Sequence, residues 1–283
     1  MHAACVDCGR QTGLRADEPV VLASVVKVPL VLEFARQVAH GQLDPAERAV
    51  VRRADRLGGT GTAGCLDDVE MSLRDLAGFA LSVSDNSAAD VLFERVGVDT
   101  VRLLVRELGL SRTRIVGSPR ALLRSMMEDV GAADPAAFAA VYPALSPARL
   151  RALRVRDPRH TNGSTAREMT RLLSLVWTDR AGPPGACAQV RALMAHQVSW
   201  HRLAAAFPED VAVAAKTGTL LGVRNEIGVV TYPDGGRYAV SVFTETADLR
   251  DRRPDLDAAI GTAGRAAVEA LRGCCGPAPH RPR

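Results

Sequence analysis

The spacing of apolar residues divides the chain into a strand-like start, a long helical middle and a strand-like end. Ala3–Val6 has the composition of a short strand, and a turn over Cys8–Thr12 follows it. Helical spacing begins at Ala23 and continues to about His40. Proline at position 29 falls in the first turns of this helix, where proline is best tolerated. We expect a first long helix shortly after the opening strand.

The middle of the chain is expected to consist of helices. Ser72 is the expected N-cap of one helix that runs to Val83, with Asp75 in its first turn. The tripeptide Ser84-Asp85-Asn86 follows, and short polar side chains of this kind are typical of a turn between helices. Further helices are expected over 87–96, 99–108, 120–130, 135–144, 147–156, 187–196 and from the cap at 162–165 to about 177.

After Pro208 the apolar period changes from helical to alternating, which predicts strands. A hairpin turn is expected at 233–236, an amphipathic helix at 255–271 and a frayed tail at 277–283. The expected strands are Val211–Thr219, Val223–Tyr232 and Arg237–Glu245.

Composition is that of a soluble globular protein, with 47% hydrophobic and 24% charged residues. The formal net charge is +4, the arginines are scattered among acids, and aromatic residues are only 4%, which argues against nucleic-acid binding. The most apolar run, 20–34, contains a lysine and a proline and is too broken to span a membrane. We expect neither nucleic-acid nor membrane partners.

The N-terminus lacks the cationic region and apolar core of a signal peptide, so the expected location is cytoplasmic, or secreted if the true start lies upstream. Six cysteines without a disulfide pattern fit a reducing compartment. Cys5 and Cys8 could bind zinc with Cys274 and Cys275 if the chain ends meet, but reduced thiols are the simpler interpretation. No metal and no cofactor are expected.

A hydroxyl and an amine stand three residues apart at Ser24 and Lys27, which places both on one helix face. A lysine can deprotonate a serine if burial and nearby positive charge keep it neutral. Only two of the 36 basic residues are lysines, the other being Lys216. Because arginine cannot lose its proton at usable pH, we expect both lysines where an amine is required. Asparagine is nearly as scarce, with Asn86, Asn162 and Asn225 only.

Three short motifs occur in one order: Ser24-x-x-Lys27, Ser84-Asp85-Asn86 and Lys216-Thr217-Gly218. With a Gly-Gly-Thr-Gly loop at 58–61 and the segment 223–228, they resemble the class A β-lactamases and the wider family of penicillin-recognising serine enzymes. The resemblance implies an α/β (α+β) fold in which an antiparallel sheet is flanked by helices. It also implies a discontinuous sheet domain, 1–21 with 206–283, and an inserted all-helical domain, 22–205.

The resemblance implies a role for each motif residue. Ser24 would be the acylated nucleophile, Lys27 its base or proton relay, and Ser84 a bridge to the leaving nitrogen. Backbone N–H groups of Ser24 and Thr219 would form the oxyanion hole. Asn86 would contact the amide side chain of the substrate. Lys216, Thr217 and Gly218 would bind the substrate carboxylate, and Arg224 would assist them.

One departure from the class A pattern bears on turnover. Where that family has a loop glutamate that positions the hydrolytic water, followed by an asparagine, the matching stretch 114–123 has neither. The segment 118–160 is also enlarged. Four carboxylates are candidate substitutes, although each is more simply a solvated helix charge: Glu128, Asp134, Asp157 and Glu168. We expect an acyl-enzyme that is released slowly.

Three functions remain open at this point. The first is a serine hydrolase acting on β-lactam-like amides or esters. The second is a biosynthetic acyltransferase or esterase that passes the same acyl group, from an ester or thioester, to another acceptor. The third is a covalent penicillin-binding protein without turnover. The family's opening helix is absent here, so either the start is misassigned or a second subunit covers the sheet, and a monomer or a homodimer is expected.

Overall fold

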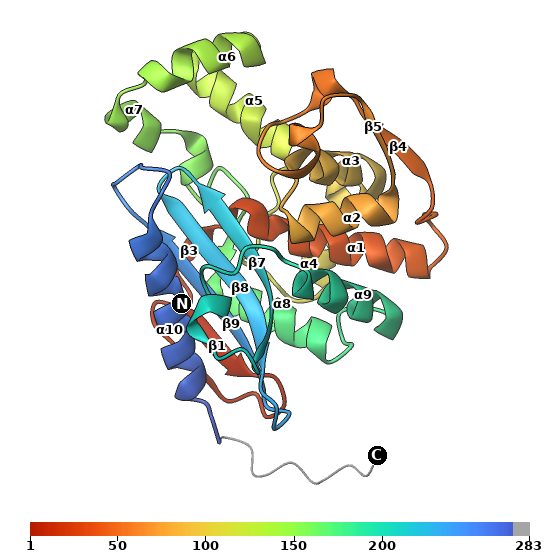
Figure 1. Cartoon of the computed structure of the whole chain (residues 1–283), viewed down its shortest axis with the longest axis vertical. Helices are drawn as coiled ribbons and strands as arrows, with labels where there is room; N and C mark the ends of the chain where they lie inside the picture. Colours follow the sequence, from red (N-terminus) through yellow and green to blue (C-terminus); the bar gives the residue numbers. More distant parts are fainter. Residues whose placement is uncertain (274–283) are drawn as a thin grey trace.

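The computed structural model describes residues 1–273, and its centre is one antiparallel sheet of five strands (Figure 1). The strand order is β2-β1-β9-β8-β7, so the first strand of the chain pairs with the last. Their bounds are β1 (His2–Cys5), β2 (Gln11–Gly13), β7 (Ala212–Leu220), β8 (Val223–Thr231) and β9 (Arg237–Glu245). The alternating apolar positions after Pro208 thus form three neighbouring strands, as expected.

Helices cover both faces of the sheet. On one face, α10 (Pro254–Glu269) packs Ile260 and Val268 against Val240 and Val242. On the other face, Ile227 and Val229 join a larger core that the middle helices supply. Figure 1 shows α8 and α10 on opposite sides of the strands. The expected fold, an antiparallel sheet flanked by helices, is confirmed.

The first long helix, α1 (Lys27–Ala39), lies at the centre of the larger core, where Leu30, Val31 and Phe34 are fully buried. Side chains cap the helices around it: Ser72 accepts from the N–H of Asp75, as expected. The helices of this group are α2 (Leu73–Ser82), α3 (Asn86–Val96), α4 (Val98–Glu107), α8 (Ala166–Trp177) and α9 (Pro184–Ala195).

The enlarged segment forms an arm of three helices, which Figure 1 shows projecting beyond the rest of the molecule. They are α5 (Pro119–Val130), α6 (Pro135–Val141) and α7 (Pro147–Arg151). None of these three helices contains a fully buried residue. Arg120 attaches the start of the arm to Asp90 of α3 with Nε–Oδ2 at 2.8 Å, and Arg156 attaches its end to Glu245 of β9 at 3.0 Å.

Short strands that the sequence did not predict lie inside the region expected to be all-helical, 22–205, or directly before it. β4 (Arg48–Val51) pairs with β5 (Val69–Ser72), and β3 (Pro19–Val21) pairs with β6 (Gly163–Thr165). Strands of three or four residues are too short to show an alternating pattern. β6 directly precedes α8, so its sequence indicated only the N-cap of that helix. β2 similarly lies partly in the stretch expected to be a turn.

Helix boundaries differ from expectation mainly at prolines. α9 begins at Pro184, because proline at the first position of a helix loses no hydrogen bond. The helix expected over 147–156 is divided into α7 and a short 3-10 turn, 154–156. In residues 1–273 no helix combines the length and apolarity that a membrane crossing needs. Cys274, Cys275 and the tail expected to be frayed lie outside the described residues.

Candidate active site

Ser24 lies in a single 3-10 turn, Ala23–Val26, directly before α1. Val25 and Val26 of this turn are buried in the core, which leaves Ser24 half-buried at its edge. Ala23 has a φ of 48°, a left-handed conformation that residues other than glycine rarely adopt. Strain of this kind collects at functional sites, where the surrounding structure enforces it. The packing of the turn therefore fixes the position of the hydroxyl.

The Lys27 amine has four oxygen neighbours. Its Nζ lies 2.7 Å from the carbonyl oxygen of Ser84 and 2.8 Å from Oδ1 of Asn86. It lies 3.2 Å from the hydroxyl of Ser24 and 3.3 Å from that of Ser84. Two motifs that are 57 residues or more apart in the chain thus meet at one nitrogen.

The chemistry of these four oxygens orients the amine. The two nearest, on Ser84 and Asn86, are carbonyl oxygens, which accept hydrogen bonds and cannot donate them. A neutral amine has two N–H groups, and these two acceptors can take both. The lone pair of the nitrogen is then left for a hydroxyl proton, and the Ser24 hydroxyl is within reach. The arrangement suits proton transfer from Ser24 to Lys27.

Burial keeps the Lys27 amine close to neutral at physiological pH. It lowers the pKa of Lys27 from 10.5 to about 7, and the nearby Asp85 carboxylate opposes this change. Burial also lowers the pKa of Lys216, well below its ordinary value, and repulsion from Lys27 adds to that effect. Burial and repulsion from nearby positive charge were both expected to lower the pKa of Lys27, and burial is the cause that does so.

Ser84 is held in an uncommon conformation by its neighbours. Its φ is 60°, and Asp85 next to it is fully buried. Asp85 accepts from the N–H of Ala88 at 3.0 Å, which starts α3, and from the N–H of Thr62 at 2.6 Å. At Gly61, with φ 76°, a Cβ atom would lie 2.4 Å from the Asp85 carboxylate. The glycine loop at 58–61 therefore packs on the Ser84 turn and supports it.

The Lys216-Thr217-Gly218 motif lies on β7, which packs directly on the Ser24 turn. A Cβ atom at Gly218 would be 2.7 Å from the carbonyl oxygen of Leu22 and 3.4 Å from Cβ of Ala23. Only glycine allows so close an approach of strand and turn. Lys216 is fully buried beside it. The structure thus brings the third motif to the other two, as expected.

Buried polar side chains that sequence reasoning missed hold β7 in place. Gln197 accepts from the N–H of Thr217 at 2.6 Å and donates to Glu226 at 2.8 Å. Arg202 donates to the hydroxyl of Thr219 at 2.8 Å and to the carbonyl oxygen of Gly218 at 3.2 Å. All three of the missed residues are at least nine-tenths buried. Each is an ordinary polar residue in the sequence, so no local pattern marked it.

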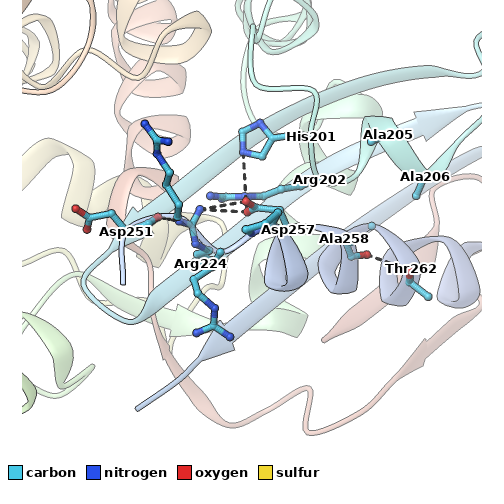
Figure 2. Close-up of a pocket in the computed structure, with 13 residues that line it drawn as sticks. His201, Arg202, Ala205, Ala206, Arg224, Asp251, Asp257, Ala258 and Thr262 are labelled. Atoms are coloured by element: carbon cyan, nitrogen blue, oxygen red, sulfur yellow. Dashed lines mark hydrogen bonds and ion pairs between the residues drawn. The ribbon is translucent and has the colours of Figure 1, made fainter. Parts of the chain in front are cut away.

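Arg224 is directed away from the lysines. Its guanidinium lies 3.2 Å from the Asp257 carboxylate and also donates to the backbone of Asp251 (Figure 2). Its strand neighbour across the ladder is Thr219, and opposite residues of an antiparallel pair share a face. A contact between Arg224 and a substrate carboxylate remains a prediction.

The three asparagines of the chain all lie around the Ser24 turn. Asn86 binds Lys27, as described. Asn225 donates to the carbonyl oxygen of Val21 at 2.7 Å, and the backbone of Asn162 accepts from the N–H of Leu22 at 2.9 Å. Asn225 and Asn162 thus fix Val21 and Leu22, the two positions directly before the turn. The scarcity of asparagine was the available signal for the last two.

Each carboxylate considered as a water activator is engaged by other partners. Glu128 pairs with Arg154 at 2.8 Å, and Asp134 caps α6. Hydrogen bonds from Arg159 lower the pKa of Asp157 to about 2. Glu168 accepts from the N–H of Arg112 and the hydroxyl of Thr113, at 2.8 and 2.6 Å. These contacts give each of the four carboxylates a structural role.

Comparison with known proteins agrees with this geometry. The sequence model described as the beta-lactamase enzyme family matches residues 1–271. The chain belongs to the beta-lactamase enzyme family. Over an alignment of 279 residues it is 33% identical to the β-lactamase regulatory protein BlaB of Streptomyces cacaoi, and the alignment covers 93% of this chain and 89% of that protein.

Solved structures show the same fold. A β-lactamase from Sphaerobacter thermophilus has a TM-score of 0.76 and 27% identity, covering 98% of this chain and 92% of that one. A mutant of PBP-A, solved as its acyl-enzyme complex with penicillin G, has a TM-score of 0.73 and 18% identity, covering 95% of this chain and 89% of that one. The expected resemblance to β-lactamase-like serine hydrolases is confirmed.

Proposed function

We propose that this member of the beta-lactamase family reacts with β-lactams through a covalent acyl-enzyme at Ser24 and releases the product slowly. The proposal rests on the surroundings of the Lys27 amine. Two carbonyl oxygens can accept from its N–H groups, and the Ser24 hydroxyl lies 3.2 Å from its nitrogen. A β-lactam carbonyl would be attacked by Ser24 Oγ as Lys27 takes the hydroxyl proton.

The proton then has a short path to the leaving group. Ser84 Oγ lies 3.3 Å from Lys27 Nζ, so it can accept a proton from the lysine and pass its own to the ring nitrogen as the amide bond breaks. This sequence leaves Lys27 and Ser84 in their starting states and Ser24 acylated. Lys216 and Thr217 would hold the substrate carboxylate on β7. Burial lowers the pKa of Lys216, but a carboxylate bound beside it would favour the protonated amine and accept a charge-assisted hydrogen bond from it.

Slow release follows from the engagement of the candidate carboxylates. Hydrolysis of the acyl-enzyme needs a base that activates water, and losing such a base commonly costs about 10²–10⁴ in rate. Glu168, the most buried of the four candidates, instead accepts hydrogen bonds from the backbone N–H of Arg112 and the hydroxyl of Thr113. Lys27 is the remaining group beside the ester, and a slow reaction through it is compatible with the proposal.

Burst kinetics with a chromogenic cephalosporin test this function. We expect a rapid phase of about one product per protein molecule, followed by a much slower steady state. Ser24→Ala should abolish both phases, while its thermal unfolding stays close to that of the parent because Ser24 is half-buried. A linear trace with fast turnover would disprove slow release, and no reaction at all would disprove the acyl-enzyme.

A second candidate is suggested by the name of one relative, the regulatory protein of Streptomyces cacaoi. In that case the acylated protein itself, rather than the hydrolysed β-lactam, would be the functional product. A cell-based assay tests this second candidate. Loss of both labelling and regulatory function in Ser24→Ala would support the acylated protein as the functional product, and full regulatory function in Ser24→Ala would contradict it.

A further inference from the structure

A cavity of about 530 Å³ lies between β1 and α8, on the side of the sheet opposite α10 (Figure 1). Strands β9 and β8 separate β1 from β7, the strand that carries Lys216, so β1 and β7 are about 15 Å apart. The volume of the cavity is in the range of small-molecule sites. The cavity is therefore a candidate binding site separate from the surroundings of Ser24.

Two elements that run side by side form its walls. One wall is a single face of α8 and its C-cap, formed by residues three or four apart: 167, 170, 171, 174, 175 and 178. The other wall begins at His2, whose imidazole is hydrogen-bonded to Thr170. Further along, Arg237 binds both Asp7 and the carbonyl oxygen of Trp177. The cavity thus has two ends, one near His2 and one where α8 ends.

The lining is cationic at both ends. It contains three guanidinium groups and, among the residues that the structure describes, no carboxylate: Arg167 and Arg171 on α8, and Arg180 just past it. Arg167 is paired with Asp17 at 2.8 Å. Within residues 1–273, no ion pair or hydrogen bond engages the guanidinium of Arg171 or of Arg180. One cation without a counter-charge therefore lies toward each end.

The spacing of these two cations requires an elongated ligand. Arg171 and Arg180 are nine positions apart, which corresponds to about 13 Å along a helix axis. Asp179 does not neutralise its neighbour Arg180, because it is bound by Arg191 at 2.6 Å. A single small anion cannot contact both cations closely. A ligand that uses both must carry a negative group at each end.

Neutral polar groups complete the lining. The Gln11 side-chain oxygen accepts from His2 Nε2 at 2.9 Å and from Arg167 Nη1 at 2.7 Å, which leaves the Gln11 amide N–H groups to donate to a ligand. Between the two cations, the hydroxyls of Ser174 and Thr178 donate to helix carbonyl oxygens at 2.9 and 2.7 Å. Since their hydrogens are used in the helix, these hydroxyl oxygens can only accept from a ligand.

We propose that this cavity binds an organic bisphosphate with a hydroxylated body, one phosphate at each end. Guanidinium groups pair with phosphate oxygens, and a phosphate monoester carries nearly two negative charges at pH 7. Arg171 would bind one phosphate, with the Gln11 amide as a further donor, and Arg180 would bind the other. Hydroxyl groups of the body would donate to Ser174 and Thr178 between them. Ser24 takes no part in this binding.

Calorimetric titration of the whole chain with fructose 1,6-bisphosphate tests the site. Fructose 6-phosphate is the matched ligand with one phosphate, and inorganic pyrophosphate is a highly charged anion too short to reach both ends. We expect saturable binding of the bisphosphate that weakens at high salt, and binding of each control at least about tenfold weaker. Fructose without phosphate should not bind.

Charge reversals locate the ligand. Arg171→Glu and Arg180→Glu change exposed side chains without a described partner, so both variants should fold, and each should weaken bisphosphate binding by at least about tenfold. Arg74→Glu, at an exposed arginine of α2 that does not line the cavity, should leave binding unchanged.

Three results would overturn the proposal. The first is the absence of saturable binding of the bisphosphate. The second is equal affinity for the bisphosphate and for pyrophosphate or fructose 6-phosphate, because a site that uses both ends must distinguish them. The third is unchanged affinity in both Arg171→Glu and Arg180→Glu, which would place the bound ligand elsewhere on the molecule.

Discussion

At the scale of single residues, the protonation of Lys27 decides whether Ser24 can react. The amine must be neutral to take a proton, and burial makes it so by bringing its pKa near 7. Removing an ammonium from water costs folding free energy, so the site is maintained at the expense of stability. The carbonyl oxygens of Ser84 and Asn86 recover part of that cost as hydrogen bonds.

The first prediction is the pH dependence of acylation. Below the pKa of Lys27 the amine is charged, so the labelling rate of Ser24 should fall about tenfold per pH unit. Above about pH 7 the amine is neutral, and the rate should reach a plateau. Stopped-flow labelling with a fluorescent penicillin at constant ionic strength measures this profile. A rate that is flat through neutral pH would exclude Lys27 as the base.

Asn86→Asp tests the same amine by adding a charge without changing shape. Asn86 Oδ1 lies 2.8 Å from Lys27 Nζ, so a carboxylate there should raise the pKa of Lys27 by at least about one pH unit. The midpoint of the labelling profile should move to higher pH by the same amount. Recovery of the parental rate in alkaline buffer is the internal control. An unshifted midpoint would mean that the profile reports another group.

Sequence reasoning identified the residues of this site better than their physical states. Scarce lysines and three short motifs predicted that Ser24, Lys27, Ser84 and Asn86 meet, and they do. Both burial and positive charge were expected to keep Lys27 neutral, but the sequence could not show that burial is the dominant cause. Arg202 was missed because its importance comes from burial against β7, which one arginine among many does not reveal.

At the scale of elements, the contact between β7 and the Ser24 turn aligns the two halves of the site. Gly218→Ala would place a methyl group 2.7 Å from the Leu22 carbonyl oxygen and force strand and turn apart. We expect a loss of about 1–3 kcal/mol in stability and a drop of about a hundredfold in labelling rate. Chemical denaturation and labelling kinetics measure the two effects.

Gly185→Ala in α9 is the matched control for that substitution. Its added methyl group would have no neighbour within 4 Å, and alanine is the better helix former. The variant should be unchanged or more stable by about 0.5–1 kcal/mol, with a parental labelling rate. If both variants label Ser24 at the parental rate, close contact between β7 and the turn is not needed for the chemistry.

Elements with a long regular pattern were predicted within a few residues, whereas short ones were missed. β9 has the bounds expected from its alternating residues, and α2 begins after its expected cap Ser72. β3 and β6 pair over three residues each, and only the folded chain brings them together. A pairing between distant short segments leaves no local periodicity to find.

At the scale of the whole molecule, stability is distributed unevenly between the core and the arm. α1 buries most of its residues, whereas α5, α6 and α7 bury none completely. Hydrogen exchange followed by mass spectrometry should show slow exchange in α1 and much faster exchange in the arm. Protection of α5 equal to that of α1 would mean that another surface covers the arm in solution.

Covalent labelling of Ser24 is best measured as the intact mass of the protein over time after mixing with penicillin G. We expect rapid gain of one penicillin mass per chain, an adduct that persists after the free drug is removed, and no adduct on Ser24→Ala. Complete hydrolysis of the penicillin with no adduct at any time would contradict slow release. A persistent adduct that remains in Ser24→Ala would contradict the assignment of the nucleophile.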